Sequence, residues 1–519
     1  MKNLPVKLIV FLIFLSACVS EIQHVPPNIV FIMSDDHGYQ AMSCYNGKLN
    51  KTPNLDRIAE EGIIFRNSFV SNSICAPSRA VMLTGKHSHL NGQINNSIEF
   101  DGSQQTFPKI LQNAGYETAI IGKWHLQSDP TGFDYWNILP GQGSYYNPDF
   151  NKMGEKGRIE GYVTDITTDL ALDWLQDSRN PDKPFCLLLH NKAPHRTWQP
   201  DTSLLDDFAS MVYPVPENYF DDYSGREAAA NQRMSVRTGD MDLVYDLKMS
   251  DKEAEIATRF KRRTDHTARM NPEQKEVWDK HYNDIITRFK KENPQGKELE
   301  EWKLQRYLRD YLACIESVDK NVGRVLDYLE ESGLDKNTLV VYTSDQGFYL
   351  GEHGWFDKRF MYEESMRTPL LMKFPVSMNI HGDINALVQN IDYAPTFLDL
   401  AGLPIPEDMS GQSMLPLIND SKLKGKWRDA LYYHYYEYPN EHAVKRHYGI
   451  RTDRYKLIHF YYDIDTWELY DLRLDPSEMN NLIKDPEYSD LIIDLKERLM
   501  ELRKEYKVPD DIPVEIEEN

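Results

Sequence analysis

Polar and ionisable residues follow directly after each of four short apolar segments of the sequence. The four groups are Asp35-Asp36-His37, Lys123-Trp124-His125, Lys192–His195 and Asp345-Gln346. Carboxylates, lysines and histidines can bind ions or transfer protons, and they are costly to bury without a partner. One such group alone is compatible with a helix cap or a solvated loop. Four groups in equivalent positions predict one shared functional site.

Oxygen ligands predominate in two of these groups. Asp35, Asp36 and Asp345 offer carboxylates, and Gln346 offers an amide carbonyl. Ca²⁺ and Mg²⁺ prefer such hard oxygen ligands, whereas no Cys/His set in the sequence has the spacing of a zinc site. We therefore expect these four residues to bind Ca²⁺ or Mg²⁺. The alternative is that they are ordinary turn residues.

The segment Cys75-Ala76-Pro77-Ser78-Arg79 places a nucleophile close to a cation. Pro77 favours the first turn of a helix, so Cys75 is predicted at a helix N-terminus, where backbone N–H groups favour an anion. Arg79 follows four residues later on the same side and can pair with that anion. A cysteine in this position is able to act as a low-pKa thiolate nucleophile.

The four apolar segments have the length and composition of buried β-strands. They are Asn28–Met33, Thr118–Ile121, Phe185–Leu189 and Thr338–Tyr342. Helical patterns lie between them, the clearest from about Trp302 to Glu331. Strands that alternate with helices predict an α/β fold with a mostly parallel sheet covered on both sides. Functional residues in such folds gather beyond the carboxyl ends of the strands.

The rest of the chain predicts an insertion and a small C-terminal unit. Residues 219–296 are charged and helix-prone, and we interpret them as a helical insertion in a catalytic domain that spans 25–425. From residue 426 to 519 the pattern changes to alternating aromatic segments, Leu431–Tyr438 and Lys456–Tyr462, and a final helix near 488–506. These features predict a small antiparallel sheet with one covering helix.

The composition indicates a globular protein of high negative charge. The 519 residues include 59 Lys+Arg and 81 Asp+Glu, which gives a formal net charge of −22. Hydrophobic residues make up 41%, enough to bury large cores and to exclude a disordered chain. The negative charge and the lack of a long basic run exclude a nucleic-acid groove. Taken alone, the same charge predicts that the protein repels anionic substrates.

The N-terminus has the features of an export signal. Lys2 and Lys7 precede the apolar run Leu8–Leu15, which is shorter than the roughly 20 residues that span a bilayer. Residues 1–18 end in Ser-Ala-Cys and resemble a bacterial lipoprotein signal, in which Cys18 becomes the lipidated first residue. We expect an exported lipoprotein, periplasmic or on the cell surface, that contacts the membrane through its lipid anchor only. The alternative is an ordinary cleaved secretory signal.

Cys75-x-Pro77-Ser78-Arg79, with Leu83-Thr84-Gly85, resembles the signature of the type I, formylglycine-dependent sulfatases of the alkaline-phosphatase superfamily. The resemblance covers nearly the whole mature chain. It includes Asp35-Asp36, Gly122–His125, His195, Ser344–Gly347 and the segment from Glu468 to Pro476. It implies an alkaline-phosphatase-like, mostly parallel sheet sandwiched by helices, with a smaller C-terminal α+β subdomain.

The resemblance also implies the chemistry. A maturation enzyme oxidises the motif cysteine, here Cys75, to formylglycine. The hydrate of formylglycine is the nucleophile, and one of its hydroxyls attacks sulfur. Loss of the proton of the second hydroxyl then expels sulfate. The implied cofactor is Ca²⁺, and its implied ligands are Asp35, Asp36, Cys75 as formylglycine, Asp345 and Gln346. Many relatives have Asn where this chain has Gln346, which leaves the geometry of that ligand open.

Five further residues receive catalytic roles from the resemblance. Arg79, Lys123 and Lys358 would stabilise charge on the sulfate oxygens. His125 would act as the base near the hydrate, and His195 would protonate the leaving oxygen.

Two segments resemble bacterial N-acetylglucosamine-6-sulfatases, including mucin-desulfating and glycosaminoglycan-acting enzymes. They are Lys192–Trp198 and Asp357-Lys358-Arg359. This implies an exo-acting hydrolase that removes 6-O-sulfate from (N-acetyl)glucosamine in glycosaminoglycans, such as heparan sulfate, or in mucin-type glycans. Asp357 and Arg359 would bind sugar hydroxyls, although a structural ion pair is an equal alternative. His447 is a candidate to close the pocket from the C-terminal sheet.

Two other functions stay open from the sequence. One is a phosphodiesterase or phosphonate monoester hydrolase of the same superfamily, and the other is a non-catalytic glycan-binding lipoprotein that never matures. The preference for N-acetyl or N-sulfo glucosamine is also open. A divalent cation together with Arg79, Lys123, Lys358 and Arg359 would reverse the local sign of the −22 charge. This favours binding of a short charged terminus in a pocket, and therefore an exo mode of action.

Overall fold

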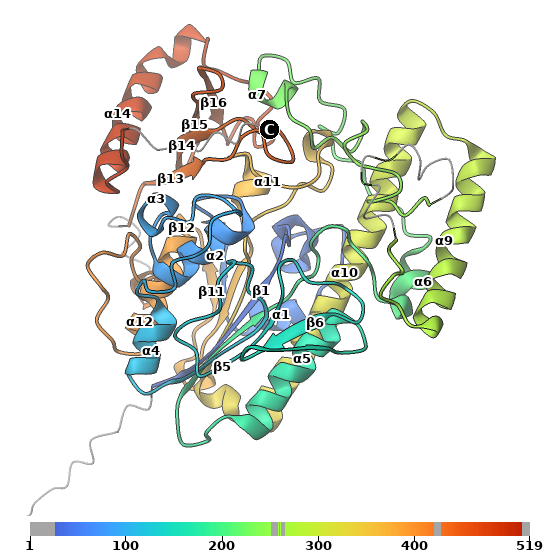
Figure 1. Cartoon of the computed structure of the whole chain (residues 1–519). Helices are drawn as coiled ribbons and strands as arrows, with labels where there is room; N and C mark the ends of the chain where they lie inside the picture. The colour runs from blue at the N-terminus through green and yellow to red at the C-terminus, as the bar shows by residue number, and fades with distance from the viewer. Residues whose placement is uncertain (1–25, 251–257, 259, 261–264, 420–426, 511–519) are drawn as a thin grey trace, which may run out of the picture.

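The computed structural model describes residues 26–250, 258, 260, 265–419 and 427–510 (Figure 1). The expected signal segment, residues 1–18 with Cys18, lies outside these ranges. Among the described helices, none combines the length and the apolar character needed to cross a bilayer.

A mixed, mostly parallel sheet forms the centre of the molecule (Figure 1). Within the described residues it has ten strands in the order β11-β2-β10-β9-β1-β8-β4-β5-β6-β7. The four predicted strands are present as β1 (Asn28–Ser34), β4 (Glu117–Lys123), β8 (Phe185–His190) and β9 (Thr338–Ser344). They lie side by side and pair in parallel, β9 with β1, β1 with β8 and β8 with β4. The predicted α/β fold is confirmed.

Shorter strands extend this sheet at both edges, and most of them pair in the antiparallel direction. They are β2 (Ile63–Phe65), β5 (Tyr135–Leu139), β6 (Asp149–Lys152), β7 (Glu155–Arg158), β10 (Leu370–Lys373) and β11 (Gly382–Ile384). A separate two-stranded sheet joins β3 (Ser68–Phe69) to β12 (Val388–Gln389). The weak sequence signal of these strands follows from their length of two to five residues.

Both faces of the central strands are buried, which explains their unbroken apolar sequences. On β1, Val30 and Ile32 point into one hydrophobic core, while Ile29, Phe31 and Met33 point into the other. The first core contains α1 (Pro53–Glu60), α5 (Val163–Asp173) and α10 (Lys297–Glu331), and the second contains α2 (Cys75–Thr84), α4 (Phe107–Asn113) and α12 (Tyr393–Leu400) (Figure 1). The helix predicted from about Trp302 begins five residues earlier, at Lys297.

The C-terminal unit is an antiparallel sheet with one covering helix, as predicted. Its strands are β13 (Ala430–Tyr435), β14 (His447–Thr452), β15 (Tyr455–Phe460) and β16 (Thr466–Asp471). The helix α14 (Ser489–Glu505) packs its Leu495 and Leu499 against Ile450 and Leu457 of the sheet.

The insertion contains less helix than its sequence suggests. Between residues 219 and 296, the described part of the chain is helical in α7 (Glu227–Ala230) and α9 (Pro272–Glu292), and most of the rest forms loops. The helix α9 lies beside α10 on the outer edge of the molecule (Figure 1), where the rings of Phe289 and Trp302 have centroids 4.4 Å apart. Shorter helices elsewhere are α3 (Ser88–Asn91), α6 (Leu205–Phe208), α11 (Glu363–Met366) and α13 (Leu415–Asn419).

A buried ion network joins the C-terminal sheet to the central domain. Lys456 of β15 is fully buried, and its Nζ lies 3.0 Å from Glu363 Oε1 and 2.7 Å from Glu478 Oε1. Arg451 of β14 lies 3.2 Å from the other oxygen of Glu363. Glu363 belongs to α11 of the central domain, so the lysine neutralises carboxylates from both sides of the junction.

Replacement of Lys456 by Met should destabilise the protein strongly. Loss of the ammonium leaves two buried carboxylates without their shared cation, and breaking a buried pair costs about 3–5 kcal/mol. The free energy of unfolding, measured in urea by circular dichroism, should fall by this amount. The matched control is Lys504→Met on α14, an exposed lysine, which should change it by less than about 0.5 kcal/mol. Equal values for the two variants would refute the role of Lys456.

Candidate active site

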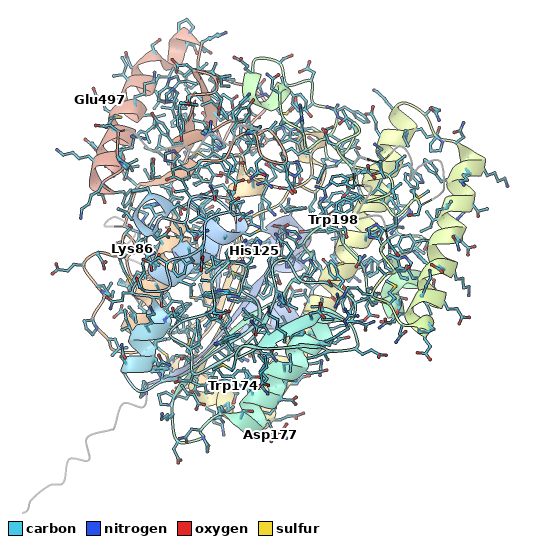
Figure 2. All side chains as sticks on the ribbon, viewed as in Figure 1. Lys86, His125, Trp174, Asp177, Trp198 and Glu497 are labelled. Atoms are coloured by element: carbon cyan, nitrogen blue, oxygen red, sulfur yellow. The ribbon has the colours of Figure 1, made fainter. Side chains whose placement is uncertain are left out.

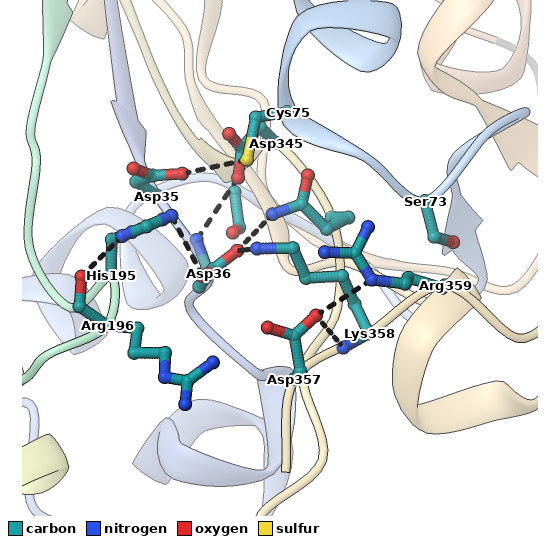
Figure 3. Close-up of polar contacts among 12 residues, drawn as sticks. Asp35, Asp36, Ser73, Cys75, His195, Arg196, Asp345, Asp357, Lys358 and Arg359 are labelled. Atoms are coloured by element: carbon teal, nitrogen blue, oxygen red, sulfur yellow. Dashed lines mark hydrogen bonds and ion pairs between the residues drawn. The ribbon is translucent and has the colours of Figure 1, made fainter. Parts of the chain in front are cut away.

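The four predicted polar groups meet at the carboxyl edge of the central sheet. Ser34 of β1 is in register with Ser344 of β9, so Asp35 and Asp345 leave the sheet side by side. The backbone N–H of Asp36 donates to Asp345 Oδ1 at 3.1 Å. Figure 3 shows these carboxylates together with Cys75, His195 and Lys358. In Figure 2, His125 of the same site lies near the middle of the molecule.

Three fully buried carboxylates form the centre of the site. Asp35, Asp36 and Asp345 each offer an oxygen within 4.8 Å of the other two. The amide nitrogen of Gln346 donates to Asp36 Oδ1, while Gln346 Oε1 and Asp36 Oδ2 have no hydrogen-bond donor among the described residues. Buried oxygens without a donor are unfavourable. The set therefore fits a divalent cation such as Ca²⁺ or Mg²⁺, which would be held by these four residues.

The pKa values of the carboxylates agree with this interpretation. Burial, together with the neighbouring carboxylates, raises the pKa of Asp36 to about 7 and that of Asp345 to about 6. Burial also acts on Asp35, but Lys123 and other cations hold its pKa well below the usual range. A divalent cation would favour the ionised form of all three carboxyl groups.

Each carboxylate also has a basic partner from another part of the chain. Lys123 Nζ pairs with Asp35, Lys358 Nζ lies 2.6 Å from Asp36 Oδ1, and Arg79 Nη2 lies 2.9 Å from Asp345 Oδ2. The three formal negative charges are thus matched by three positive ones. Addition of a divalent cation would make the site net positive, which suits an anionic substrate in a chain of net charge −22.

A glycine allows Lys123 to reach this position. Gly122 precedes it on β4 with φ of +101°, and a Cβ at this point would lie 2.0 Å from the carbonyl oxygen of His190 on β8. Only glycine combines this backbone conformation with such a close approach. The strand can therefore turn its last side chain toward Asp35.

Cys75 is the first residue of α2, as the sequence predicts. Its Sγ lies 3.6 Å from Asp35 Oδ1, and the residue is only 1% exposed. A low-pKa thiolate, the option that the sequence offers, is not favoured for the unmodified side chain. Burial raises the pKa of the Cys75 thiol, and Asp35 and Asp345 add to this effect, so the helix N-terminus and the nearby lysines do not compensate.

Two histidines flank the cluster. Nδ1 of His195 lies 2.6 Å from the carbonyl oxygen of Arg196, so it carries the proton in the neutral ring, and Nε2 faces Asp36 Oδ2 at 3.9 Å. His125 is nearly buried, with φ of +57°. Burial lowers the pKa of both histidines well below the usual value. Both are therefore neutral until a nearby anion favours the protonated form.

Part of this site opens into a cavity of about 890 Å³. Its lining includes Cys75, His125, His195 and Lys358, together with side chains of the insertion such as Tyr245 and His266. The volume is within the range of sites for small ligands.

Asp357 and Arg359 line the same cavity, as expected of residues that bind a substrate. Arg359 Nε lies 3.4 Å from Asp357 Oδ1, and its Nη1 lies 3.4 Å from Glu437 Oε2. Burial alone would raise the pKa of Asp357, but Lys358, His442 and Arg359 hold it well below its usual range. The ionised carboxylate is thus available to accept hydrogen bonds from a ligand.

His447 does not reach the cavity, which corrects the expectation from the sequence. It is fully buried on β14, where its ring centroid lies 5.9 Å from Phe360 and 5.6 Å from Tyr433, and its Nδ1 lies 2.7 Å from the carbonyl of Lys445. The alternation of side chains along the strand directs this ring into the aromatic core.

Two polar residues at the site were not predicted. His442, in the loop before β14, places Nε2 3.2 Å from Asp357 Oδ2, while its Nδ1 lies 2.7 Å from the carbonyl oxygen of Arg233. Gln142 accepts a hydrogen bond from Lys123 Nζ at 2.6 Å. Both residues lie in loops without a recognisable motif, so the sequence offered no signal for either.

The chain matches two protein-family descriptions. Residues 27–403 match the family described as "Sulfatase". Residues 351–505 match the family described as "N-sulphoglucosamine sulphohydrolase, C-terminal".

Individual relatives are similar over most of the chain. A Bacteroides thetaiotaomicron protein named N-acetylglucosamine-6-O-sulfatase is 51% identical over 489 residues, which are 93% of this chain and 87% of the relative. A solved structure described as a complex with its substrate D-glucosamine-2-N,6-O-disulfate matches with a TM-score of 0.89 and 50% identity, over 95% of this chain and 100% of that chain. The phosphonate monoester hydrolase of Agrobacterium radiobacter shares the fold, with a TM-score of 0.64 at 19% identity over 92% and 96% of the two chains.

Calcium should stabilise the protein through the carboxylate cluster. At about 100 times its Kd, a ligand that binds only the folded state adds about 2.7 kcal/mol to the free energy of unfolding. The melting temperature, measured by scanning calorimetry, should rise when Ca²⁺ replaces a chelator. Gln346→Met removes a ligand oxygen but keeps the size of the side chain, and should reduce the rise. A melting temperature independent of Ca²⁺ in the natural protein would contradict the site.

The rise in melting temperature caused by Ca²⁺ should depend on pH. The raised pKa values of Asp36 and Asp345 mean that protons occupy these groups below about pH 6 and compete with the cation. Both groups are ionised above about pH 7, and binding then needs no proton release. The rise caused by Ca²⁺ should therefore be larger near pH 8 than near pH 5. A larger rise at the lower pH would contradict the assignment.

Proposed function

Because the chain belongs to the sulfatase family, as its match over residues 27–403 shows, we propose that it hydrolyses the 6-O-sulfate of N-acetylglucosamine or N-sulfoglucosamine in sulfated glycans. The observation that carries the proposal is the common cavity of Cys75 and the Asp357-Lys358-Arg359 segment. It joins a site for sulfate ester cleavage to side chains that can bind a sugar. The name of the 51% identical relative supports the same substrate.

The nucleophile is proposed to arise from Cys75 by oxidation. A maturation enzyme uses an external two-electron oxidant to convert the CH₂SH group to an aldehyde, with oxygen replacing the sulfur, which leaves as sulfide. The hydrate of this formylglycine supplies one hydroxyl to attack sulfur, and deprotonation of the other expels sulfate and restores the aldehyde. The burial of Cys75 beside Asp35 supports this, because the unmodified thiol has a raised pKa. Ca²⁺, when held by the carboxylates and Gln346, supplies positive charge for the sulfate oxygens.

The other side chains of the site have separate roles in the reaction. Lys123 and Lys358 orient the sulfate group and stabilise its charge, while Arg79 holds Asp345 and the carbonyl of Lys123. His125 accepts a proton from the nucleophile. His195 gives a proton to the sugar oxygen that leaves, and the approach of the anionic ester raises its pKa for this step. The overall reaction adds water to the ester and releases a sugar alcohol and sulfate.

An exo mode of action is part of the proposal. The cavity of about 890 Å³ has the size of a small-ligand site, and its lining includes the cationic side chains of Lys192, Lys358 and Arg359. A terminal sulfated sugar of a glycosaminoglycan, such as heparan sulfate, or of a mucin-type glycan fits such a site better than the middle of a polymer.

Hydrolysis of defined sulfated sugars tests the function. The enzyme should release sulfate from N-acetylglucosamine-6-sulfate, and Cys75→Ala should abolish turnover without loss of the folded structure by circular dichroism. His195→Ala should lower kcat by roughly 10²–10⁴-fold, since it removes the general acid. Intact-peptide mass spectrometry over Cys75 should detect the aldehyde in place of the thiol.

Assays with other substrates distinguish the proposed function from its alternatives. Activity on a phosphodiester analogue far above that on 4-nitrophenyl sulfate would indicate the phosphodiesterase or phosphonate hydrolase alternative. Activity on 2-O-sulfated uronic acid, but not on N-acetylglucosamine-6-sulfate, would exclude the 6-O-glucosamine substrate. Unmodified Cys75 in the native host would favour a glycan-binding protein without catalysis.

We also propose that the protein is an exported lipoprotein anchored through Cys18, in the periplasm or on the cell surface. The support is the sequence of residues 1–18 alone. Cys18→Ser should move the protein from the membrane fraction to the soluble fraction of the native host, because a cleaved chain without lipid has no anchor. Cys44→Ser is the matched control and should stay in the membrane fraction. Equal distribution of the natural protein and Cys18→Ser would contradict the anchor.

A further inference from the structure

Lys192 is a lysine on the cavity wall whose charge has no counterpart in the site. It follows β8 by two residues, lines the same cavity as Cys75 and His195, and is only 4% exposed. Lys123 and Lys358 each pair with a carboxylate. In the described part of the chain, Lys192 Nζ has neither a carboxylate partner nor a hydrogen-bond acceptor. It lies over the ring of Tyr145, 4.7 Å from the centroid.

This arrangement is unfavourable in the absence of a ligand. An ammonium group carries three donors, and a buried charge without acceptors is costly. A ring face supplies only part of the lost hydration. Burial lowers the pKa of Lys192 to about 8, and the positive charge of Lys123 contributes to the decrease. An anion in the cavity would accept hydrogen bonds from the ammonium group and raise its pKa.

The position of the ammonium group is fixed from two sides. The hydroxyl of Tyr145 donates to the carbonyl oxygen of His195 at 2.6 Å, so the ring under Lys192 is tied to the segment that carries a catalytic histidine. On the same loop, Gln142 accepts from Lys123 Nζ at 2.6 Å. The loop from Gln142 to Tyr145 therefore holds Lys123 by a hydrogen bond and Lys192 by its ring. Lys192 lines the cavity, and Lys123 is fully buried behind the same loop.

We propose that Lys192 binds a sulfo group of the substrate, as a cation in addition to Lys123, Lys358 and Arg79. The inference rests on the proposed function, since it deepens the description of how that substrate is held. Two parts of a sulfated glucosamine share the required chemistry, namely the 6-O-sulfate that is cleaved and an N-sulfo group at C2. The unpaired ammonium recognises either one through charge-assisted hydrogen bonds.

Steady-state kinetics of Lys192→Met test the inference. The substitution keeps most of the apolar side chain and removes the ammonium group, so KM should rise by about 10- to 100-fold, the usual effect of losing a hydrogen bond to a charged group. Lys192→Arg keeps the charge and should restore most of the loss. The matched control is Lys297→Met, because Lys297 also lies over a ring, 4.8 Å from the centroid of Phe220, but on the exposed surface. Its KM should equal that of the natural protein.

Two substrates identify the source of the sulfo group. An equal rise in KM for N-acetylglucosamine-6-sulfate and N-sulfoglucosamine-6-sulfate assigns Lys192 to the ester that is cleaved. A rise for the N-sulfo sugar alone assigns it to the substituent at C2. If KM for both sugars changes by less than about twofold while the melting temperature falls, Lys192 is a structural residue and the inference is overturned.

Binding of inorganic sulfate separates this inference from the proposed function. If the natural protein hydrolyses neither sugar, the proposed function fails, and the inference is tested by calorimetric titration of the Ca²⁺-loaded protein with sodium sulfate. Lys192→Met should weaken sulfate binding by about tenfold relative to the natural protein and Lys297→Met. Equal affinities in the three proteins would overturn the inference.

Discussion

Charge balance around three buried carboxylates is the constraint on which the site depends. Asp35, Asp36 and Asp345 leave adjacent strands at a depth without solvent, where an uncompensated carboxylate is strongly unfavourable. Lys123 reaches the cluster from a third strand, and Lys358 reaches it from the loops beyond β9. The parallel order of the strands and the place of α2 bring these charges together. The net charge of −22 describes the outer surface and says little about this centre.

Much of the fold could be predicted because its signals are local. An apolar run such as Phe185–Leu189 has the length of a strand buried on both faces, and Pro77 favours a helix start at Cys75. The convergence of Asp35, Lys123 and Asp345 also follows, since carboxyl ends of parallel strands meet at one edge. Short edge strands carried too little periodicity to be recognised, and most of the insertion lacks the helical structure that its composition suggests.

The features of the site that could not be predicted depend on tertiary structure. The path of a loop brings His442 to Asp357, and the alternation of side chains along β14 turns His447 into the aromatic core. The residue type reveals neither position. The protonation of Cys75 depends on depth: a helix N-terminus favours a thiolate at a surface, but the same position under full burial beside Asp35 favours the thiol. Lys192 was part of a recognised segment, yet only the arrangement of Tyr145 and the cavity shows that its charge is unpaired.

The partners in the charge cluster are distant along the chain, and this has a consequence for the order of folding. Asp36 and Lys358 are separated by 322 positions, and Arg79 and Asp345 by 266. Closure of such long loops is entropically costly and comes late relative to local structure. No fragment that ends before Lys358 contains the complete set of charges. A growing chain therefore cannot assemble the charge cluster until Lys358 has been added, and a truncated chain that ends before this residue has no complete site.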